Sequence, residues 1–589
     1  MINPKIMENK SLIKKAFQYI KSILIGKKLI LMIFAFTLMI IVSFAITYVP
    51  VLLGKIVDSV ILNDITSFES IKNYLIVIAI LLIGSELLIL IRKYIVENIA
   101  TQLEKNEFVK ISKHILSVDL QALNTERIGA LNVKIHRSIE GVISILKLIF
   151  IEILPTFMIT LVAIYIISTT NIYVSIVTIV VLIISIIVTF NQIKSQANIR
   201  VKIFRAKEDM GAKNSELLLG IEYVKSSGAI PMEINKVEKL AENLREKEFT
   251  HHKYMMTYDS AKMLIEILGL IFVISLSSLL AIEGEVSKGD VLTLAMLYSS
   301  VTVPLRSLNR FLDEGFEAIL KIGDLLNTYA KPLDIGLLGK EEPLIDDGII
   351  IDCRNVSYVL DNKVILDDIN LQIRKGEKIG IAGSSGSGKS TLIKIILGLN
   401  YHYNGNLKVF NKEVKDINKL SLSRLISYVS QNPFIIKGTI KDNVIYPHNE
   451  DIEEHVIMRA IKLSKIDELL ESSSLGLNKN IEEQGKNISG GEKQRLALSR
   501  LFLPNDSEII IMDEATSALD SINQENIQKA VNSNNIEKTI IVIAHRLKTL
   551  QDMDKIIVFN QGKIAEVGKY EDLIKQNGIF KTLVDKEKH

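Results

Sequence analysis

The sequence has little cysteine and little net charge, and each shortage excludes a class of protein. Cys353 is the single cysteine among 589 residues, so neither an intrachain disulfide nor a cysteine zinc site can form. The formal net charge of +3 is too small to indicate a nucleic-acid partner. No cleavable signal peptide is apparent, because the apolar stretch opening at Leu29 is longer than a signal core and lacks a small-residue cleavage pattern behind it.

Apolar residues are abundant instead, and they are unevenly distributed. They make up 48% of the chain, against 23% charged residues. A chain of this length exceeds one hydrophobic core, so at least two domains are expected. Long apolar runs lie before about Pro304, whereas the residues after about Gly348 have the composition of a soluble α/β domain.

Six apolar runs are long enough to cross about 30 Å of hydrocarbon. They lie near Leu29–Leu53, Tyr74–Val96, Val142–Ser168, Ile172–Phe190, Met263–Ile282 and Val291–Leu308. Lysine and arginine gather before the first run and after the second and fourth, which predicts cytoplasmic N- and C-termini. The long segments after the second and fourth runs predict helices that continue beyond the bilayer as two cytoplasmic elbows.

The chain therefore divides into four predicted segments. They are an amphipathic helix at 1–28, a six-span membrane domain at 29–330, a linker rich in proline and glycine at 331–347, and an α/β domain with a helical subdomain at 348–589. In the first segment Ile13, Phe17, Ile20 and Leu24 recur at helical spacing among lysines, which favours a helix on the membrane surface. The alternative is a disordered basic leader.

A glycine-rich loop lies between a strand-like and a helical segment of the α/β domain. The strand-like Lys378–Ala382 is followed by Gly383, Ser384, Ser385, Gly386, Ser387, Gly388, Lys389, Ser390 and Thr391, and then by a helical run. Strand, glycine loop and helix form the context of a phosphate-binding loop, where backbone amides and the helix N-terminus surround phosphates. Lys389 adds a point charge, and the Ser390 hydroxyl is placed for Mg²⁺. By itself the loop predicts nucleotide binding only.

Two further motifs follow. An apolar strand pattern ends in Asp513, which can hold Mg²⁺ through water, and Glu514, which can polarise an attacking water. Ser489, Gly490 and Gly491 open a helix and offer a second anion site, or else simply an N-cap with flexible glycines. The chain thus has two phosphate-binding devices for one adenine site.

From Tyr358 onward the α/β domain resembles the nucleotide-binding domain of ABC transporters. The glycine loop matches Walker A, Asp513 ends Walker B, and Ser489, Gly490 and Gly491 match the signature. The resemblance implies roles for further residues: Tyr358 stacks on adenine, Gln431 belongs to the Q-loop at the magnesium, Asp520 to the D-loop, and His545 is the switch histidine beside the catalytic Glu514. Two positions depart from the pattern. Ile488 replaces a leucine, and Glu492 replaces a glutamine, so a carboxylate near the phosphates is expected to slow turnover.

With six spans ahead of that domain, the whole chain is similar to exporter-type half-transporters for drugs, lipids or peptides. The resemblance implies ATP and Mg²⁺ as cofactors and alternating access in a bacterial plasma membrane. It also implies a dimer, with a homodimer favoured and a heterodimer open, in which each signature acts on the other subunit's ATP.

A leader-cleaving cysteine-protease domain is not seen before the spans. A nucleotide-gated channel or regulator and a membrane-bound phosphotransferase stay open as alternatives, although an intact Glu514 disfavours the first and the lack of an acceptor-binding segment the second.

The cargo is the least determined property. Glu86, Glu152 and Glu266 lie inside predicted spans, which favours a cationic or amphipathic cargo. The alternative for Glu266 is an ion pair with Lys262, one turn earlier. Tyr298 opens a polar stretch of the sixth span that faces either a cavity or a neighbouring helix.

Overall fold

The computed structural model describes residues 4–61, 68–123, 128–360, 362–448, 452–471, 474–534, 537–544 and 546–588. The chain forms two compact units. The helical unit consists of Met1–Leu116 and Glu126–Lys331, and the α/β unit of Ser117–Thr125 and Pro332–His589. The short segment at 117–125 thus belongs by its contacts to the α/β unit, although it lies inside the helical part of the sequence.

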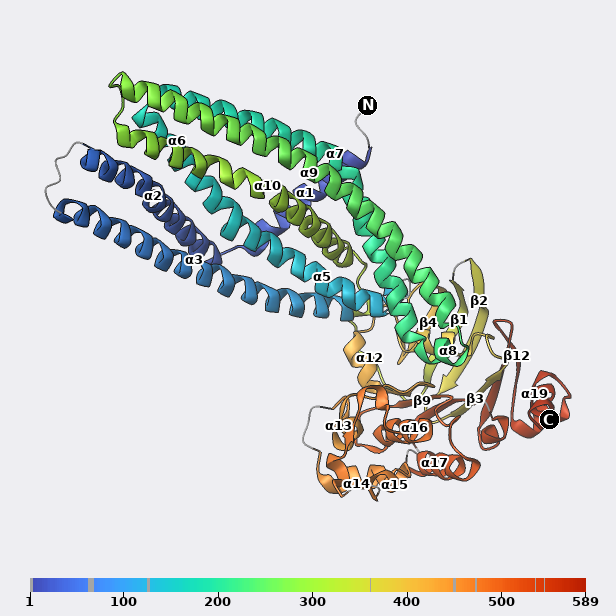
Figure 1. The fold of residues 1–589 in the computed structure, drawn as a ribbon. Coiled ribbons are helices and arrows are strands. Elements are labelled where there is room, and N and C mark those ends of the chain that lie inside the picture. Colours follow the sequence, from blue (N-terminus) through green and yellow to red (C-terminus); the bar gives the residue numbers. More distant parts are fainter. Residues whose placement is uncertain are drawn as a thin grey trace. The chain divides into compact units, whose positions relative to one another are not determined.

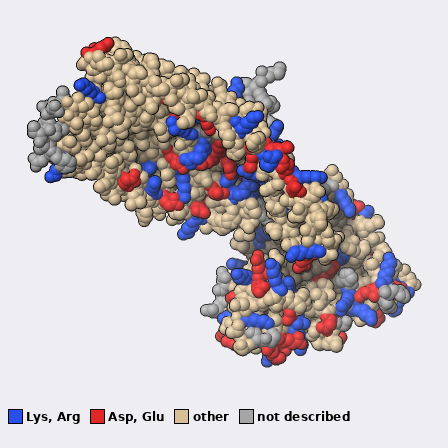
Figure 2. Space-filling view, in the orientation of Figure 1, with Lys and Arg blue, Asp and Glu red and all other residues tan. Residues whose placement is uncertain are grey.

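The helical unit is built of long helices that lie side by side (Figure 1). Its elements are α1 (Pro4–Ile23), α2 (Lys27–Ile61), α3 (Phe68–Leu116), α5 (Ile128–Lys147), a π-helix η1 (Leu148–Ile153), α6 (Leu154–Thr170), α7 (Ile172–Leu219), α8 (Ile221–Ser226), α9 (Ile230–Ile282) and α10 (Lys288–Tyr329). Six stretches of the described helices are long and apolar enough to span a membrane, which confirms the six predicted spans. A broad part of this unit carries almost no charged side chains (Figure 2).

The helices run well past the apolar stretches, as the sequence predicted. Helix α3 has 49 residues, α7 has 48 and α9 has 53, whereas about 20 residues suffice to cross a bilayer. The sequence also favours a turn around Asn124–Gly129, which falls mostly on residues outside the described part.

Helix α1 packs against protein. Ala16 and Ile20 are buried in a cluster with Ile111 of α3, Val142 of α5 and Ile322 of α10. The Tyr19 hydroxyl donates to the buried carboxylate of Glu107, which also accepts from Tyr329 at 3.1 Å. One face of the predicted surface helix is therefore covered by α3, α5 and α10, while Phe17 stays exposed.

A π-helix interrupts the third apolar stretch. The wider turn of η1 frees backbone carbonyls from the regular helical ladder, and such groups need partners inside a membrane. Arg92 of α3 supplies them, donating to the carbonyl oxygens of Phe150 at 2.8 Å and Ile151 at 3.4 Å. Arg92 is 5% exposed, so this charged residue lies inside the helix bundle.

The α/β unit contains a six-stranded sheet in the order β12-β11-β3-β10-β9-β6. Its strands are β3 (Lys378–Gly383), β6 (Ile426–Val429), β9 (Ile509–Asp513), β10 (Thr539–Ile543), β11 (Lys555–Asn560) and β12 (Lys563–Gly568). All pairings are parallel except that of β11 with β12. The isoleucine-rich strands β9 and β10 are buried throughout, as expected for a parallel sheet covered on both faces.

A second sheet and several helices complete this unit. The second sheet is antiparallel, in the order β2-β1-β4-β5, and a short pair β7-β8 joins the helical subdomain. The remaining strands are β1 (Ile349–Leu360), β2 (Lys363–Arg374), β4 (Tyr403–Val409), β5 (Lys412–Glu413), β7 (Gly438–Thr439) and β8 (Asn480–Ile481). The helices are α4 (Leu120–Leu123), α11 (Lys389–Ile396), α12 (Lys419–Leu425), α13 (Ile440–Ile445), α14 (Glu454–Leu463), α15 (Asp467–Glu471), α16 (Gly490–Ser499), α17 (Ser521–Asn534), α18 (Tyr570–Lys575) and α19 (Ile579–Lys588), with 3₁₀ turns η2 (Ile335–Leu337), η3 (Gly476–Asn478), η4 (Glu483–Gly485), η5 (Arg500–Phe502) and η6 (Leu547–Leu550). The predicted α/β domain with a helical subdomain is confirmed.

Helices α2 and α10 approach closely through two glycines. A Cβ atom added to Gly289 would lie 2.0 Å from the carbonyl oxygen of Gly54, and the Gly289 amide donates to Asp58 at 2.6 Å. We therefore expect Gly289→Ala to separate the helices and to destabilise the protein by about 1–3 kcal/mol, the usual range for overpacking. A thermal melt of the purified protein in lipid nanodiscs measures this.

Gly84→Ala is the matched control, because a Cβ at Gly84 of α3 meets no atom within 4 Å and alanine favours a helix. Equal melting temperatures for the two variants would contradict the close approach of α2 and α10.

Candidate functional site

The glycine loop joins β3 to α11 at the carboxyl edge of the parallel sheet. Gly388 has a φ of +104°, and a Cβ there would lie 2.8 Å from the carbonyl oxygen of Ile365, so only glycine fits. The Lys389 ammonium donates to the loop carbonyls of Gly383 at 2.8 Å and Ser384 at 2.9 Å. Burial lowers the pKa of Lys389, although nearby carboxylates oppose the shift. The loop carbonyls thus hold the Lys389 ammonium within the loop.

Two adjacent carboxylates follow β9 and reach this loop. Asp513 is 7% exposed and accepts from the Ser390 hydroxyl at 3.3 Å. Burial raises the pKa of Asp513, and Ser390 partly opposes the shift. Glu514 has a φ of +49°, which is uncommon outside glycine, and its carboxylate accepts from the Gln431 amide at 2.6 Å. The predicted set Ser390, Gln431, Asp513 and Glu514 therefore comes together.

Tyr428 is a further neighbour of this site, which the sequence analysis did not single out. It lies on β6, the strand next to β9, and burial together with Asp513 raises its pKa to about 12. The parallel pairing of β6 with β9 is what places it there, and no local signal in the sequence gives that pairing.

A cleft of about 750 Å³ lies in front of the loop, a size that suits a nucleotide. It is lined by Lys363, Ile365, Gly383, Ser384, Ser385, Gly386, Ser387, Gly388, Lys389, Ser390, Thr391, Gln431, Glu514, Ala544, Leu547, Leu583, Lys586 and Glu587. All nine residues of the predicted loop are among them. The last three come from α19, which the sequence analysis did not single out.

Tyr358 does not line this cleft. Its side chain is 2% exposed and belongs to the core beneath β1, with Val356 and Leu366. Side chains alternate along a strand, so a residue on the core side has no free ring face to offer. The expectation that Tyr358 stacks on adenine is wrong, and the cleft-lining residues given above include no aromatic ring.

His545 lies outside the described residues. Its neighbours Ala544 and Leu547 line the cleft, which brings the chain on both sides of His545 to the nucleotide region.

The signature serine and glycines begin α16 away from the cleft-lining set. Ser489 is the N-cap, and it forms a reciprocal capping box with Glu492: the Ser489 amide donates to the Glu492 carboxylate at 2.6 Å, and the Glu492 amide donates to the Ser489 hydroxyl at 3.2 Å. Burial favours the neutral acid, yet the hydrogen bonds from Ser489 keep the pKa of Glu492 below its usual value. The carboxylate that replaces glutamine is thus engaged by its own helix start.

Asp520, the predicted D-loop residue, also caps a helix. Its carboxylate accepts from the amides of Ile522 at 3.1 Å and Asn523 at 2.9 Å, and these bonds lower its pKa. Neither Asp520 nor the three signature residues line the cleft of their own chain.

The membrane candidates separate into exposed and buried residues. Glu86 is exposed on α3, and Glu152 of η1 pairs with Arg310 of α10. Glu266 is 2% exposed and pairs with Arg306 at 2.8 Å. The alternative pairing of Glu266 with Lys262 is wrong, because the Lys262 ammonium instead lies 2.9 Å from Asp259.

Tyr298 is 1% exposed, and its hydroxyl donates to the Glu266 carbonyl oxygen at 2.9 Å. A Cβ at Gly269 would collide with this hydroxyl, so the small residue makes room for it. Tyr298 therefore packs between α9 and α10.

Two chain segments enter the α/β unit side by side. Val118 and Leu333 form an antiparallel bridge, in which the Asp119 amide donates to the Pro332 carbonyl at 3.0 Å and the Asp334 amide donates to the Ser117 carbonyl at 2.8 Å. The segment predicted as a linker at 331–347 is therefore hydrogen-bonded to the segment at 117–123 and is no free tether.

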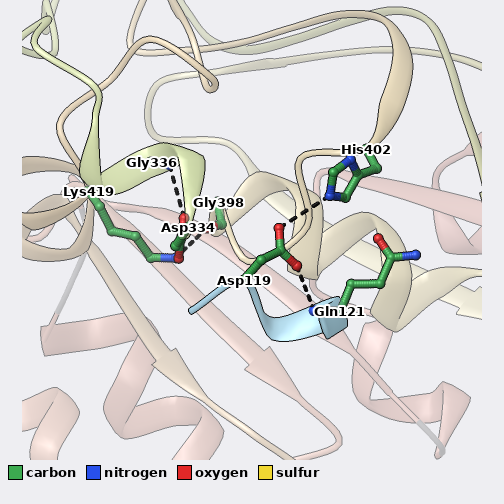
Figure 3. Close-up of polar contacts among 7 residues, drawn as sticks. All are labelled: Asp119, Gln121, Asp334, Gly336, Gly398, His402 and Lys419. Carbon is green, nitrogen blue, oxygen red and sulfur yellow. Dashed lines mark hydrogen bonds and ion pairs between the residues drawn. The ribbon is translucent and has the colours of Figure 1, made fainter. Parts of the chain in front are cut away.

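Side chains fasten both segments to the body of the unit (Figure 3). Asp119 lies 3.2 Å from His402, just ahead of β4. Lys419, the first residue of α12, donates both to the Asp334 carboxylate at 2.5 Å and to the Gly398 carbonyl at 2.6 Å. Gly398 follows the end of α11, whose first residue is Lys389. A short chain of polar bonds thus connects the phosphate-loop helix to the entry of both segments.

Two family models match the chain, and both describe ABC transporters. The model described as ABC transporter transmembrane region matches residues 32–305, and the model described as ABC transporter matches residues 366–517. The chain therefore belongs to the ABC transporter family, and its α/β unit hydrolyses ATP to drive transport.

The chain is also similar to curated bacterial proteins over most of its length. It is 26% identical to the transport/processing ATP-binding protein ComA of Streptococcus pneumoniae over 90% of this chain and 74% of that protein. It is 31% identical to the lactococcin-A transport/processing ATP-binding protein LcnC of Lactococcus lactis, over 62% of this chain and 50% of that protein. It is 29% identical to the ATP-dependent lipid A-core flippase of Pseudomonas fluorescens, over 65% of this chain and 63% of that protein.

A solved structure of a bacterial Atm1-family ABC exporter with ATP bound has the same fold. Its TM-score is 0.83 over 94% of this chain and 98% of that chain, at 22% identity. The chain thus has the fold of an ABC exporter.

The capping box generates a prediction about Glu492. Because glutamine can replace glutamate in a capping box, Glu492→Gln should keep the start of α16 and leave ATP turnover within about twofold. Glu492→Ala removes the cap, which costs about 0.5–2 kcal/mol, and should lower both turnover and melting temperature. Phosphate release and thermal melts of the two variants measure this. A clear rise in turnover for Glu492→Gln would instead show that the carboxylate repels the phosphates.

Proposed function

We propose that the chain exports an amphipathic drug, lipid or peptide across a bacterial plasma membrane, working as a dimer by alternating access. The observation that carries this proposal is that the cleft and the signature helix start lie apart in one chain, so a second chain is needed to complete each site. A second copy of this chain can complete both ATP sites, because Lys389, Glu514 and Ser489 each match the residue type that the family pattern requires. A heterodimer with a distinct partner chain stays open. Positive charges before the first span and after the second and fourth support cytoplasmic termini.

Hydrolysis within the cleft follows from the side chains that surround it. Lys389 attracts the phosphates, and Glu514 accepts a proton from the attacking water, its carboxylate restrained by Gln431. The hydroxyl, carboxylate and amide oxygens of Ser390, Asp513 and Gln431 suit Mg²⁺, which takes oxygen ligands and keeps several waters. The ion, when bound, would neutralise phosphate charge. His545 would steady the γ-phosphate, the role that the resemblance implies for it.

Coupling between hydrolysis and transport would use the two paired segments. The chain runs without a break from Leu116 at the end of α3 into Ser117, and from α10 through Lys331 into Pro332. Since Lys419 bonds both to Asp334 and to Gly398 beyond the phosphate-loop helix, a displacement of α11 on nucleotide binding is passed to the entry of both segments. Alternating access requires such a route between two states.

The cargo class follows from the charges that the spans leave free. Glu152 and Glu266 are matched by Arg310 and Arg306, so their charges are balanced within the protein. The exposed Glu86 is left as the candidate for contact with a positive group on the cargo. The names of the relatives, which include transport/processing proteins and a lipid A-core flippase, support an amphipathic peptide or lipid.

Replacing the proposed base tests this mechanism. Glu514→Gln should lower phosphate release about 10²–10⁴-fold, the usual contribution of a positioned base, while ATP binding persists. The measurement is phosphate release by the full chain in nanodiscs, beside binding of a fluorescent ATP analogue.

Glu525→Gln is the matched control, since Glu525 is exposed and pairs only locally with Lys529. Turnover near that of the unmodified chain in Glu514→Gln would refute the role of Glu514. ATP binding that opens a conductance in vesicles without hydrolysis would favour the nucleotide-gated channel instead.

The coupling route gives a separate prediction. Lys419→Met should leave basal ATP turnover within about twofold, because Lys419 is remote from the phosphates, but should reduce cargo accumulation in inverted vesicles several-fold. Lys408→Met, at an exposed position of β4, serves as control. Equal loss of hydrolysis and transport in Lys419→Met would contradict a role restricted to coupling.

A further inference from the structure

Helix α19 forms one wall of the nucleotide cleft. Phe580 and Val584 are buried in the core, which fixes the inner face of the helix. Its first turn is held by Glu566 of β12, whose carboxylate accepts from the amides of Ile579 and Phe580. The other side of the helix contributes Leu583, Lys586 and Glu587 to the lining of the cleft. In Figure 1 α19 is the helix beside the C-terminal label.

A carboxylate of α19 holds the chain that follows the switch position. Glu587 accepts from the backbone amide of Leu547 at 2.8 Å. Leu547 begins the short 3₁₀ helix η6, whose N-cap Arg546 makes no side-chain capping bond. The first amides of a helix have no partner within it, and Glu587, 40 residues further along the chain, satisfies this one. Leu547 lies two residues after His545.

Helix α17 restrains the same segment from another direction. The Arg546 guanidinium donates to Gln524 at 3.0 Å, and Gln528 donates to the Thr549 carbonyl at 2.5 Å. Before the switch position, β10 is buried and paired in the sheet. Ala544 thus follows directly on a strand of the sheet, and the chain from Arg546 to Thr549 is held by bonds to α17 and α19. Glu587 supplies the bond to Leu547, which lines the cleft.

The charge of Glu587 needs an explanation, since a carboxylate beside a phosphate cleft opposes the binding of a polyanion. Its bond to the Leu547 amide engages one carboxylate oxygen with a donor, and the cationic Lys586 lies next to it in the cleft lining. Two roles can be separated by experiment. A carboxylate that matters by its charge alters the affinity for ATP, and one that matters by its hydrogen bond alters the rate of hydrolysis.

We propose that Glu587 is a positioning residue for ATP hydrolysis, which holds the backbone after His545 so that the histidine meets the γ-phosphate. This inference rests on the role proposed above for His545. Small displacements of a reacting group can cost up to about 10²-fold in rate. Loss of one of several restraints is expected to cost less, about three- to tenfold in kcat.

The test compares Glu587→Ala with Glu587→Gln in the full chain in nanodiscs, measuring kcat and KM for ATP. Glutamine keeps an acceptor oxygen and removes the charge. We expect Glu587→Ala to lower kcat about three- to tenfold with KM within about twofold, and Glu587→Gln to restore most of kcat. Thr582→Ala, at an exposed position of the same helix outside the cleft lining, is the control and should leave kcat unchanged.

A double-mutant cycle with His545→Ala tests whether Glu587 acts through the histidine. In that background Glu587→Ala should lower kcat by less than about twofold, because the group it positions is already gone. An undiminished further loss would overturn the inference. So would equal losses in Glu587→Ala and Glu587→Gln accompanied by a shift in KM, or an unchanged kcat in both.

His545→Ala by itself separates a failure of the role proposed for His545 from a failure of the inference about Glu587. If it keeps its turnover, the role of His545 is wrong and the inference fails with it. If it loses turnover while Glu587→Ala keeps it, the inference alone fails. If thermal melts show that Glu587→Ala is destabilised, the decision rests on Glu587→Gln, made both in the unmodified chain and in His545→Ala. A kcat equal to that of the respective parent supports the hydrogen bond. A loss of kcat as large as that caused by alanine overturns it.

Discussion

The parallel pairing of β3, β9 and β10 is the constraint on which the nucleotide site depends. Parallel strands end at the same edge of a sheet, so the glycine loop after β3, the carboxylates after β9 and the segment after β10 are forced together although they are far apart in sequence. Strands β9 and β10 are isoleucine-rich and buried throughout, so the core of the unit holds them in the middle of the sheet. Lys389 and Glu514 therefore line one cleft, and Asp513 is bonded to Ser390, which lines the same cleft.

Features that arise from local sequence were predicted well. The six spans follow from the length of apolar runs, and the phosphate loop follows from glycines between a strand and a helix. The capping box of Ser489 and Glu492 is also local, since its partners are three residues apart, although the sequence analysis considered only the N-cap serine. It also changes the meaning of Glu492, because a carboxylate that accepts from its own N-cap amide is held by the helix it begins.

Features that depend on distant partners were missed or assigned wrongly. Lys262 was the nearest cation to Glu266 along the chain, but the bundle brings Arg306 to it instead. Tyr358 was assigned to adenine from its motif, whereas the side-chain alternation of β1 turns it into the core. The bonds of Lys419 and Glu587 join elements that no periodicity relates, so the sequence by itself gave no reason to select either residue.

Arg92 has a consequence for how the third span can deform. A π-turn can in principle migrate along a helix, since each residue that joins it at one end leaves it at the other. The guanidinium that binds the Phe150 and Ile151 carbonyls pins the extra residue at one position, and Pro155, which lacks an amide hydrogen, lies just beyond it. The third span therefore consists of two regular helices, α5 and α6, joined at a fixed π-turn, and any bend in it is centred on the residues that Arg92 binds.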